Sequence, residues 1–233
     1  MKDFDKIYDL FDEACEEADE GVCSESGLQK FRDVLEALGE PKNSKADKES
    51  ILYAYALSHL AYATLSLAVF EYDSDVISEK KALDHYAEAL EGFRKSMNAF
   101  ESMEQTDDRD YLYADSCQMF AEFIRIICCD SEKRGLKDLN EEDIENLYKK
   151  SIDLYENLLS GEAYDTREEL VDVCYNAAGY YYDKDRYDKS HPLFERSKAI
   201  AEELEAEEPG AYEEFLGSID DYLEDGKNGK LFV

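Results

Sequence analysis

The sequence predicts an all-α protein built from antiparallel helix pairs, and three observations support this prediction. Apolar residues recur at helical spacing nearly from end to end, and no segment alternates as a strand would. Only 3 prolines and 11 glycines occur in 233 residues. Alanine, leucine, glutamate and lysine are abundant, and these residues favour helices. We expect one right-handed stack of four pairs and a capping ninth helix over residues 1–224, with a flexible C-terminal tail over 225–233.

Two helices are expected before residue 42. Apolar residues share one face of a first helix that starts at Phe4 and ends near Gly21. Ser24 or Ser26 caps a second helix, because the side-chain oxygen of a serine accepts a hydrogen bond from a backbone N–H of the first turn. The segment Gly39-Glu-Pro41 then stops the second helix.

The third expected helix is the least charged part of the chain. Ile51 to Phe70 is long enough to span a bilayer and carries no formal charge. It also contains His59, several tyrosines and many small residues, and acidic residues follow it. We therefore interpret the segment as a central core helix that runs to Glu71, and we expect no contact with a membrane.

Capping residues also mark the next three helices. Ser78 caps the fourth helix, and Asp107 or Asp108 caps the fifth. The sequence Asn140-Glu-Glu-Asp has the form of a capping box and opens the sixth helix. This helix ends at Ser160-Gly161.

Three more helices complete the chain. Thr166 caps the seventh helix. The eighth begins at Ser190, which leaves Pro192 in its first turn, and runs to about Glu205. A ninth helix spans about Ala211 to Leu223.

The segment Asp172–Ile200 has a recognisable pattern of small and large residues. Ala178 and Ser190 are small where two paired helices would cross, and three large residues fill the space between the helices: Tyr181, Tyr187 and Phe194. In this pattern the segment resembles one tetratricopeptide repeat. It departs from the family at Cys174, where a tryptophan is usual, and at Pro192.

Two weaker copies of the second helix of this repeat occur earlier, over residues 86–97 and 148–158. The tyrosines that open the three helices are Tyr86, Tyr148 and Tyr187, and their spacing is irregular. The resemblance therefore implies degenerate repeats with longer helices and loops than the family has.

The resemblance implies a binding site, since tetratricopeptide domains bind peptides on a concave surface lined by the first helix of each pair. The candidates on the third, fifth and seventh expected helices are Tyr55, Tyr62, Ser66, Asp115, Gln118, Glu122, Arg125, Asp172, Tyr175, Asn176 and Tyr182. On each helix they recur at i, i+3, i+7 or nearby spacings and so share one face. The alternative is that the tyrosines belong to the core and the charges are merely solvated.

The charge of the chain constrains the partner. The sequence has 58 acidic and 26 basic residues, a formal net charge of −32. This charge repels a phosphate backbone, so we expect no nucleic-acid binding. It attracts basic segments, which predicts a basic or amphipathic peptide or helix of another protein as the partner. The alternative is that the charge only keeps the protein in solution.

No motif predicts catalysis, a cofactor or a metal site. The three histidines lie on separate expected helices or their ends, and no glycine-rich phosphate loop occurs. The six cysteines form no C-x-x-C pair, so reduced thiols and a cytoplasmic location are the simplest interpretation. The adjacent Cys128 and Cys129 could form a redox pair, but buried helix cysteines are commoner.

Two alternative functions stay open. The nine-helix layout, the acidity and Asn176 followed by the aromatic run 180–182 also resemble 14-3-3 proteins. Phosphate binding needs converging bases, however, and the third helix has none between Lys48 and Lys80. Gln118-Met119 stands where that family has an Arg-Tyr pair. We therefore expect no phosphopeptide binding, whereas a self-associating structural role, including a homodimer, remains possible.

Overall fold

The computed structural model of the protein describes residues 3–19, 24–41, 44–129 and 139–227. Within these ranges the chain forms helices and no strands, which confirms the predicted all-α fold. Residue contacts divide the chain into two compact units, Met1–Ile144 and Glu145–Val233, which we call unit 1 and unit 2. One domain over 1–224 and a right-handed stack stay predictions, and most of the expected tail lies outside the described residues.

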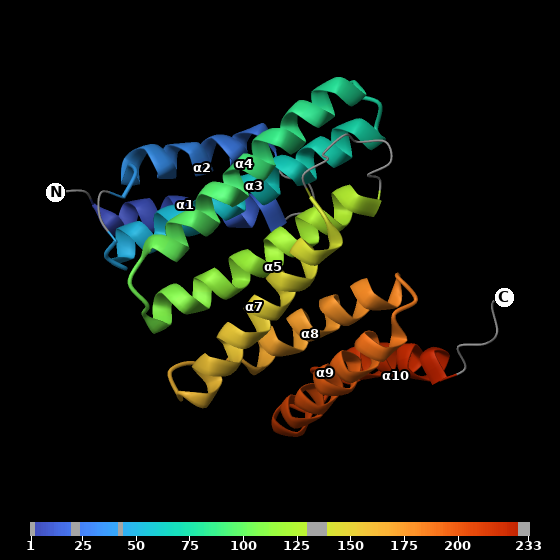
Figure 1. Ribbon diagram of the computed structural model, residues 1–233. Coiled ribbons are helices and arrows are strands. Elements are labelled where there is room, and N and C mark those ends of the chain that lie inside the picture. The colour runs from blue at the N-terminus through green and yellow to red at the C-terminus, as the bar shows by residue number, and fades with distance from the viewer. Residues whose placement is uncertain (1–2, 20–23, 42–43, 130–138, 228–233) are drawn as a thin grey trace. The chain divides into compact units, whose positions relative to one another are not determined.

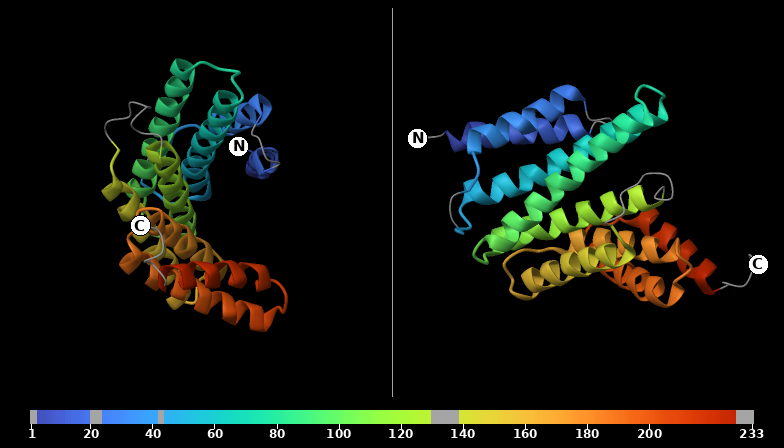
Figure 2. Two further views of the ribbon diagram at one scale, coloured as in Figure 1. Left: turned by 90° about the vertical axis from the view of Figure 1, so that its right-hand side faces the viewer. Right: turned by 45° about the horizontal axis from the view of Figure 1, so that its top comes forward.

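Unit 1 contains α1 (Phe4–Asp19), α2 (Glu25–Leu38), α3 (Lys48–Asp73), α4 (Glu79–Ser102) and α5 (Asp107–Cys129). α1 packs against α2, and α3 packs against α4, as two antiparallel pairs that follow each other in chain order (Figure 2). α5 also packs against α3 and runs in the same direction as α3 (Figure 1). The first helices of successive pairs therefore lie side by side.

Side chains cap α2, α3 and α4. Ser24 accepts a hydrogen bond from the Gly27 backbone N–H at 3.1 Å, and Ser78 accepts one from that of Lys81 at 3.4 Å. Both serines were predicted as caps. Asp47 caps α3 in the same way, at 2.9 Å from the backbone nitrogen of Ser50. α3 is therefore longer at both ends than the apolar run that predicted it.

The predicted cap of α5 is wrong. Asp107 and Asp108 belong to the first turn of the helix. The hydroxyl of Thr106 instead accepts the hydrogen bond from the Arg109 backbone N–H, at 3.3 Å. Carboxylates in the first turn still favour the helix, because they lie at the positive end of its dipole.

α3 and α4 approach closely along a stripe of small residues. Ser96 donates a hydrogen bond of 2.7 Å to the Ala54 carbonyl, and its oxygen lies 2.6 Å from that of Ser58. A β-carbon added to Gly92 would lie 3.0 Å from the Cβ of Ala61. The small side chains let the two backbones approach, and the hydroxyls satisfy each other in the core.

By length and composition, α3 could cross a membrane, and no other helix in the described part of the chain meets both requirements. In the structure, 61% of its most apolar window is buried inside the protein. It packs against α4, α2 and α5, and Leu52, Ala56 and Ala63 join the core cluster formed with α1 and α2.

Unit 2 contains most of α7 (Glu141–Ser160), together with α8 (Arg167–Tyr182), α9 (Tyr187–Glu207) and α10 (Glu213–Lys227). α8 packs against α9, and α10 packs against α9. α7 contacts the others through Tyr148 and Tyr180, whose ring centroids are 6.2 Å apart, and through an ion pair between Glu156 and Arg196.

The starts of α7, α8, α9 and α10 test four predictions. The capping box of α7 is confirmed, since the Asn140 side chain accepts from the Asp143 backbone N–H and Asp143 accepts from that of Asn140. Thr166 precedes α8 as predicted but does not cap it, because its hydroxyl donates to the Tyr155 carbonyl at 2.7 Å.

α9 begins at Tyr187, one turn before the predicted Ser190, so that Pro192 lies inside the helix. A proline there removes one helical N–H, and the carbonyl that would have accepted it belongs to the exposed Asp188 and can bond to water. α10 starts and ends later than expected, and residues 225–227 belong to it.

Candidate functional site

The predicted site residues of unit 1 lie on two neighbouring helices, and one hydrogen bond aligns them. The hydroxyl of Tyr55 on α3 donates to a carboxylate oxygen of Asp115 on α5 at 2.8 Å. Because the two helices run in the same direction, equal steps along each lead to neighbouring residues. The bond therefore fixes which residues of α5 lie beside which residues of α3.

Seven residues further along each helix come Tyr62 and Glu122, and eleven residues along come Ser66 and Ile126. Steps of 7 and 11 residues return to nearly the same side of a helix, so both sets point the same way. Tyr62 and Ile126 are each 37% exposed. We call this surface the α3–α5 face and define it by Tyr55, Tyr62, Ser66, Asp115, Glu122 and Ile126.

A packed aromatic cluster supports one edge of the face. The ring centroid of Tyr55 is 4.4 Å from that of His59 and 5.6 Å from that of Phe11 on α1. Phe31 of α2 stacks on His59 at 5.9 Å. Tyr55 is therefore held from two sides, by its ring contacts and by its hydrogen bond to Asp115. It is a rigid part of the face, while Tyr62 is the more accessible tyrosine.

His59 is uncharged at neutral pH. Burial lowers its pKa to about 4, because the protein interior solvates the imidazolium poorly. Its Nε2 atom is buried without a hydrogen-bond partner among the described residues, and its Nδ1 atom lies 3.7 Å from the Sγ atom of Cys15. A neutral imidazole cannot stabilise a thiolate as an imidazolium would, so this pair is not an activated Cys–His dyad.

The charges of the α3–α5 face are mainly acidic. Asp115 and Glu122 lie on it, and Asp73 follows Tyr55 by five full helical turns at the end of α3. Arg125, a predicted site residue beside the face, lies 3.5 Å from a Glu122 oxygen. This pairing leaves the base poorly placed to capture a phosphate group. Gln118 is half-buried one turn after Asp115.

The predicted site residues of unit 2 lie on α8, and the tyrosines among them take part in helix packing. The ring centroid of Tyr175 is 5.0 Å from that of Phe215 and 6.1 Å from that of Tyr222, both on α10. Tyr182 lies 5.1 Å from Tyr222 and 6.4 Å from Phe194. Both rings therefore pack against other aromatic rings of unit 2, which favours the alternative that these two tyrosines stabilise the fold.

The remaining two candidates of unit 2 are more accessible. Asp172 is exposed, yet loss of water on its protein side and the neighbouring carboxylates of Glu169 and Glu168 raise its pKa. Asn176 is half-buried. The structure therefore places seven candidates on the neighbouring helices α3 and α5, where contacts join Tyr55 to Asp115 and Glu122 to Arg125, and four candidates on α8.

Two exposed apolar residues within α3 and α5 were not predicted as site residues. Ile126 belongs to the α3–α5 face, and Phe70, 48% exposed, lies two turns beyond Tyr62 on α3. Ile126 follows Asp115 by 11 residues and Glu122 by 4, and this helical spacing could have placed it on the same side of α5. We missed it because an isoleucine in an amphipathic helix is usually a core residue.

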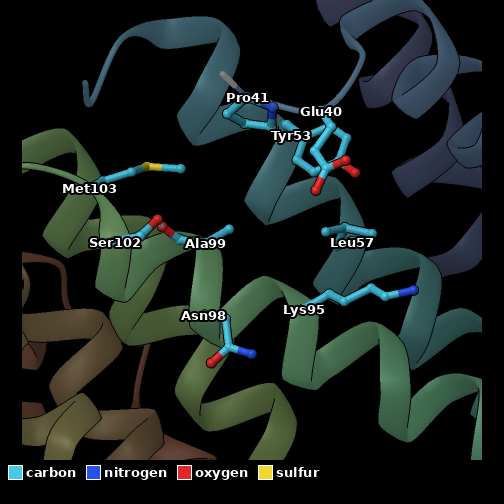
Figure 3. A pocket seen from close by; sticks show the side chains of 9 residues that line it. All are labelled: Glu40, Pro41, Tyr53, Leu57, Lys95, Asn98, Ala99, Ser102 and Met103. Atoms are coloured by element: carbon cyan, nitrogen blue, oxygen red, sulfur yellow. Dashed lines mark hydrogen bonds between the residues drawn. The ribbon is translucent and has the colours of Figure 1, made fainter. Parts of the chain in front are cut away.

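A cavity in unit 1 lies on another side of α3 and has a volume of about 360 Å³ (Figure 3). It lies between α3, α4 and the segment that follows α2. Its lining residues are Glu40, Pro41, Tyr53, Leu57, Lys95, Asn98, Ala99, Ser102 and Met103.

The chemistry of this cavity is limited. Its four most polar side chains, Glu40, Lys95, Asn98 and Ser102, are exposed at the rim. The Ser102 hydroxyl donates to the Ala99 carbonyl, so it is not aligned with a base. Burial, with a smaller effect of the Glu40 carboxylate, raises the pKa of Tyr53. The lining holds neither a histidine nor a cysteine.

In the part of the chain that the structure describes, no group of three or more His, Cys, Asp or Glu side chains is arranged to hold a metal ion. Cys15, Cys117 and Cys174 are thiols outside any disulfide, and burial raises the pKa of Cys174 to about 11. The side chains of Cys128 and Cys129 lie outside the described residues, so their suggested redox role is untested.

No protein-family model matches the chain, and no curated protein matches it. Inference about function therefore depends on the α3–α5 face and the charge of the chain.

Proposed function

We propose that the protein is a tetratricopeptide-like helical scaffold that binds a basic or amphipathic segment of another protein on its α3–α5 face. The observation that carries the proposal is the combination of Tyr62 and Ile126, each 37% exposed, with the carboxylates of Asp115 and Glu122 on the same face. Tyrosine buries a large area at low entropic cost, and carboxylates attract a basic partner.

Electrostatics would act mainly on the rate of encounter. A net charge of −32 steers a cationic segment toward the protein and repels a second copy of the same acidic face. Binding should therefore weaken as the salt concentration rises, because salt screens exposed charges. The reduced state of Cys15, Cys117 and Cys174 fits a reducing compartment such as the cytoplasm.

A binding role is favoured over catalysis for two reasons. The cavity in Figure 3 has its polar groups at the rim, where water competes for them. The Cys15–His59 contact lacks the charge separation that an activated thiol needs, since the pKa of His59 is lowered to about 4.

Site-specific photo-crosslinking tests the proposal directly. A photoreactive phenylalanine analogue replaces Tyr62 in one variant and Ala87, an exposed residue of α4, in a matched control. Both are irradiated in lysate of the source cell, and the crosslinked peptides are identified by mass spectrometry. We expect a crosslink from position 62 to a lysine- or arginine-rich segment, which salt suppresses and position 87 does not give. Equal labelling from both positions would reject the α3–α5 face as the binding site.

A further inference from the structure

We infer that the occupant of the α3–α5 face is a basic amphipathic helix of about five turns and not an extended peptide. This inference rests on the proposed function and adds the conformation and sequence pattern of the partner. Three features of unit 1 support it: the order of charges along the face, the spacing of its exposed apolar residues, and the scarcity of groups that could bond to a peptide backbone.

Carboxylates lie at the two ends of the face, and between them exposed apolar residues lie beside a third carboxylate, Glu122, which is paired with Arg125. Asp115 lies beside Tyr55 at one end, and Asp73 closes α3 at the other. Between these ends are Tyr62, Ile126 and Phe70, exposed by 37%, 37% and 48%. A complementary partner has bases at both ends and apolar residues in the middle.

The dimensions of the face set the spacing in the partner. With a rise of 1.5 Å per residue, Tyr62 and Phe70 are separated by about 12 Å along α3, with Ile126 near the midpoint. The acidic ends, at Tyr55 and Asp73, are about 27 Å apart. A helix of 19 residues covers this length, with apolar residues at i, i+4 and i+7 or i+8 and bases near i−7 and i+11.

Backbone hydrogen bonding favours a helix over an extended chain. An extended peptide pressed on the face would bury its N–H and C=O groups, and each needs a partner. Between Tyr62 and Phe70 the described side chains of the face offer no amide group, and the Ser66 hydroxyl donates to the Tyr62 carbonyl at 3.0 Å. A helix satisfies its backbone internally and so presents only side chains to Tyr62, Ile126 and Phe70.

Arg125 limits where the bases of the partner can lie. Its guanidinium is 3.5 Å from Glu122, near the middle of the face. The base repels a second cation there and partly neutralises Glu122. The partner's bases are therefore favoured at its ends and disfavoured at its centre, and replacement of Arg125 by alanine should strengthen binding of a basic helix.

Designed peptides test the inference without knowledge of the natural partner. The probe is a fluorescein-labelled, alanine-based 19-residue peptide with leucines at i, i+4, i+7 and i+8 and lysines at both ends. One control has the same composition with the leucines spread around the helix, and a second has a central proline. Both controls keep the charge, so non-specific attraction to the acidic protein is the same. Binding to the full chain is measured by fluorescence anisotropy, and helicity by circular dichroism.

We expect the amphipathic peptide to bind at least tenfold more tightly than either control, a difference of about 1.4 kcal/mol. Tyr62→Ala and Ile126→Ala should each weaken binding about tenfold, in the range of a moderate hot spot. Ala87→Ser, on the exposed side of α4, should leave it unchanged. Circular dichroism of each variant confirms that the fold is retained.

Two results would overturn the inference: equal affinity for the proline-containing peptide, or an affinity that Tyr62→Ala does not change. Failure of all three peptides to bind would overturn it as well. The proposed function is judged separately, because a crosslink from position 62 to an extended or proline-containing basic segment would support the face and reject the helix. The absence of both crosslink and peptide binding would reject both.

Discussion

The hydroxyl of Tyr55 donates a hydrogen bond of 2.8 Å to Asp115, 60 positions later in the chain, and so joins α3 to α5. The bond connects helices of different pairs, each the first of its pair in the predicted arrangement. It holds an acidic group against a half-buried aromatic residue at the edge of the proposed binding surface. The stability of this contact therefore affects the alignment of all the residues that follow it on both helices.

Tyr55→Phe should destabilise the protein by about 1–2 kcal/mol, because it removes a hydrogen bond to a charged acceptor and leaves the ring contacts intact. The measurement is the free energy of unfolding from denaturant titration of the full chain. Tyr8→Phe is the matched control, since Tyr8 is 47% exposed on α1. Identical unfolding curves for Tyr55→Phe and the wild type would show that the bond contributes nothing to stability.

Gly92→Ala should destabilise unit 1, although alanine is the better helix former. The added Cβ would lie 3.0 Å from the Cβ of Ala61, whose position is fixed by the α3 backbone. We expect a net loss of about 1–2 kcal/mol. Gly217→Ala on α10 is the opposite case, since nothing lies within 4 Å of its added Cβ, and it should gain about 0.5–1 kcal/mol. Thermal melts of the two variants should therefore move in opposite directions.

His59 should make stability fall as the solution becomes acidic. Its pKa is about 4 in the folded protein, against an ordinary value of 6.5. Between these values the unfolded chain binds the proton and the folded protein does not, so the stabilisation present above pH 6.5 is lost as the pH falls toward 4. The loss amounts to at most about 3 kcal/mol.

The test of this pH dependence compares the wild type with His59→Phe, a variant of similar size among Phe11, Phe31 and Tyr55. The many carboxylates titrate in both proteins and largely cancel in the difference. Between pH 7 and pH 4 the wild type should lose stability relative to the variant. A constant difference in unfolding free energy over this range would contradict the lowered pKa.

Thr166→Val should destabilise unit 2 by about 1–2 kcal/mol, because it leaves the Tyr155 carbonyl without its donor. The Thr166 hydroxyl donates to that carbonyl at 2.7 Å and is fully buried. Ser160→Ala is the control, since its hydroxyl makes a similar bond to the Asn157 carbonyl at an exposed position. Hydrogen exchange of the amides of α7 and α8 should be faster in Thr166→Val only.

Sequence reasoning predicted the fold class and most helices, because the helical spacing of apolar residues is a direct record of which side is buried. It also identified the caps Ser24, Ser78 and Asn140. It did not identify Thr106 as the cap of α5. Thr106, Asp107 and Asp108 are consecutive residues that can each cap a helix, and the position where the helical backbone begins determines which of them does so. Sequence reasoning failed again at Thr166, whose hydroxyl bonds to a carbonyl 11 residues away.

The candidate site was predictable to the extent that it depends on single helices. The spacing of Tyr55 and Tyr62 placed them on one side of α3. The same spacing joins Tyr175 and Tyr182 on α8, but there α10 packs against them through Tyr222. Which helix lies over a given face depends on tertiary contacts between distant segments. A single sequence records that information only weakly, so exposed and covered tyrosines looked alike.

The hydrogen bonds among Ser58, Ser96 and the Ala54 carbonyl fix how α3 and α4 are aligned along their axes. The close approach of Gly92 to Ala61 also restricts a slip of α3 along α4 by one turn. Such a slip of about 5.4 Å would separate the two hydroxyls and leave both unsatisfied in a dry interface. Sequences in which both serines become alanine should therefore still form the two helices, but with a less strictly fixed axial alignment between them.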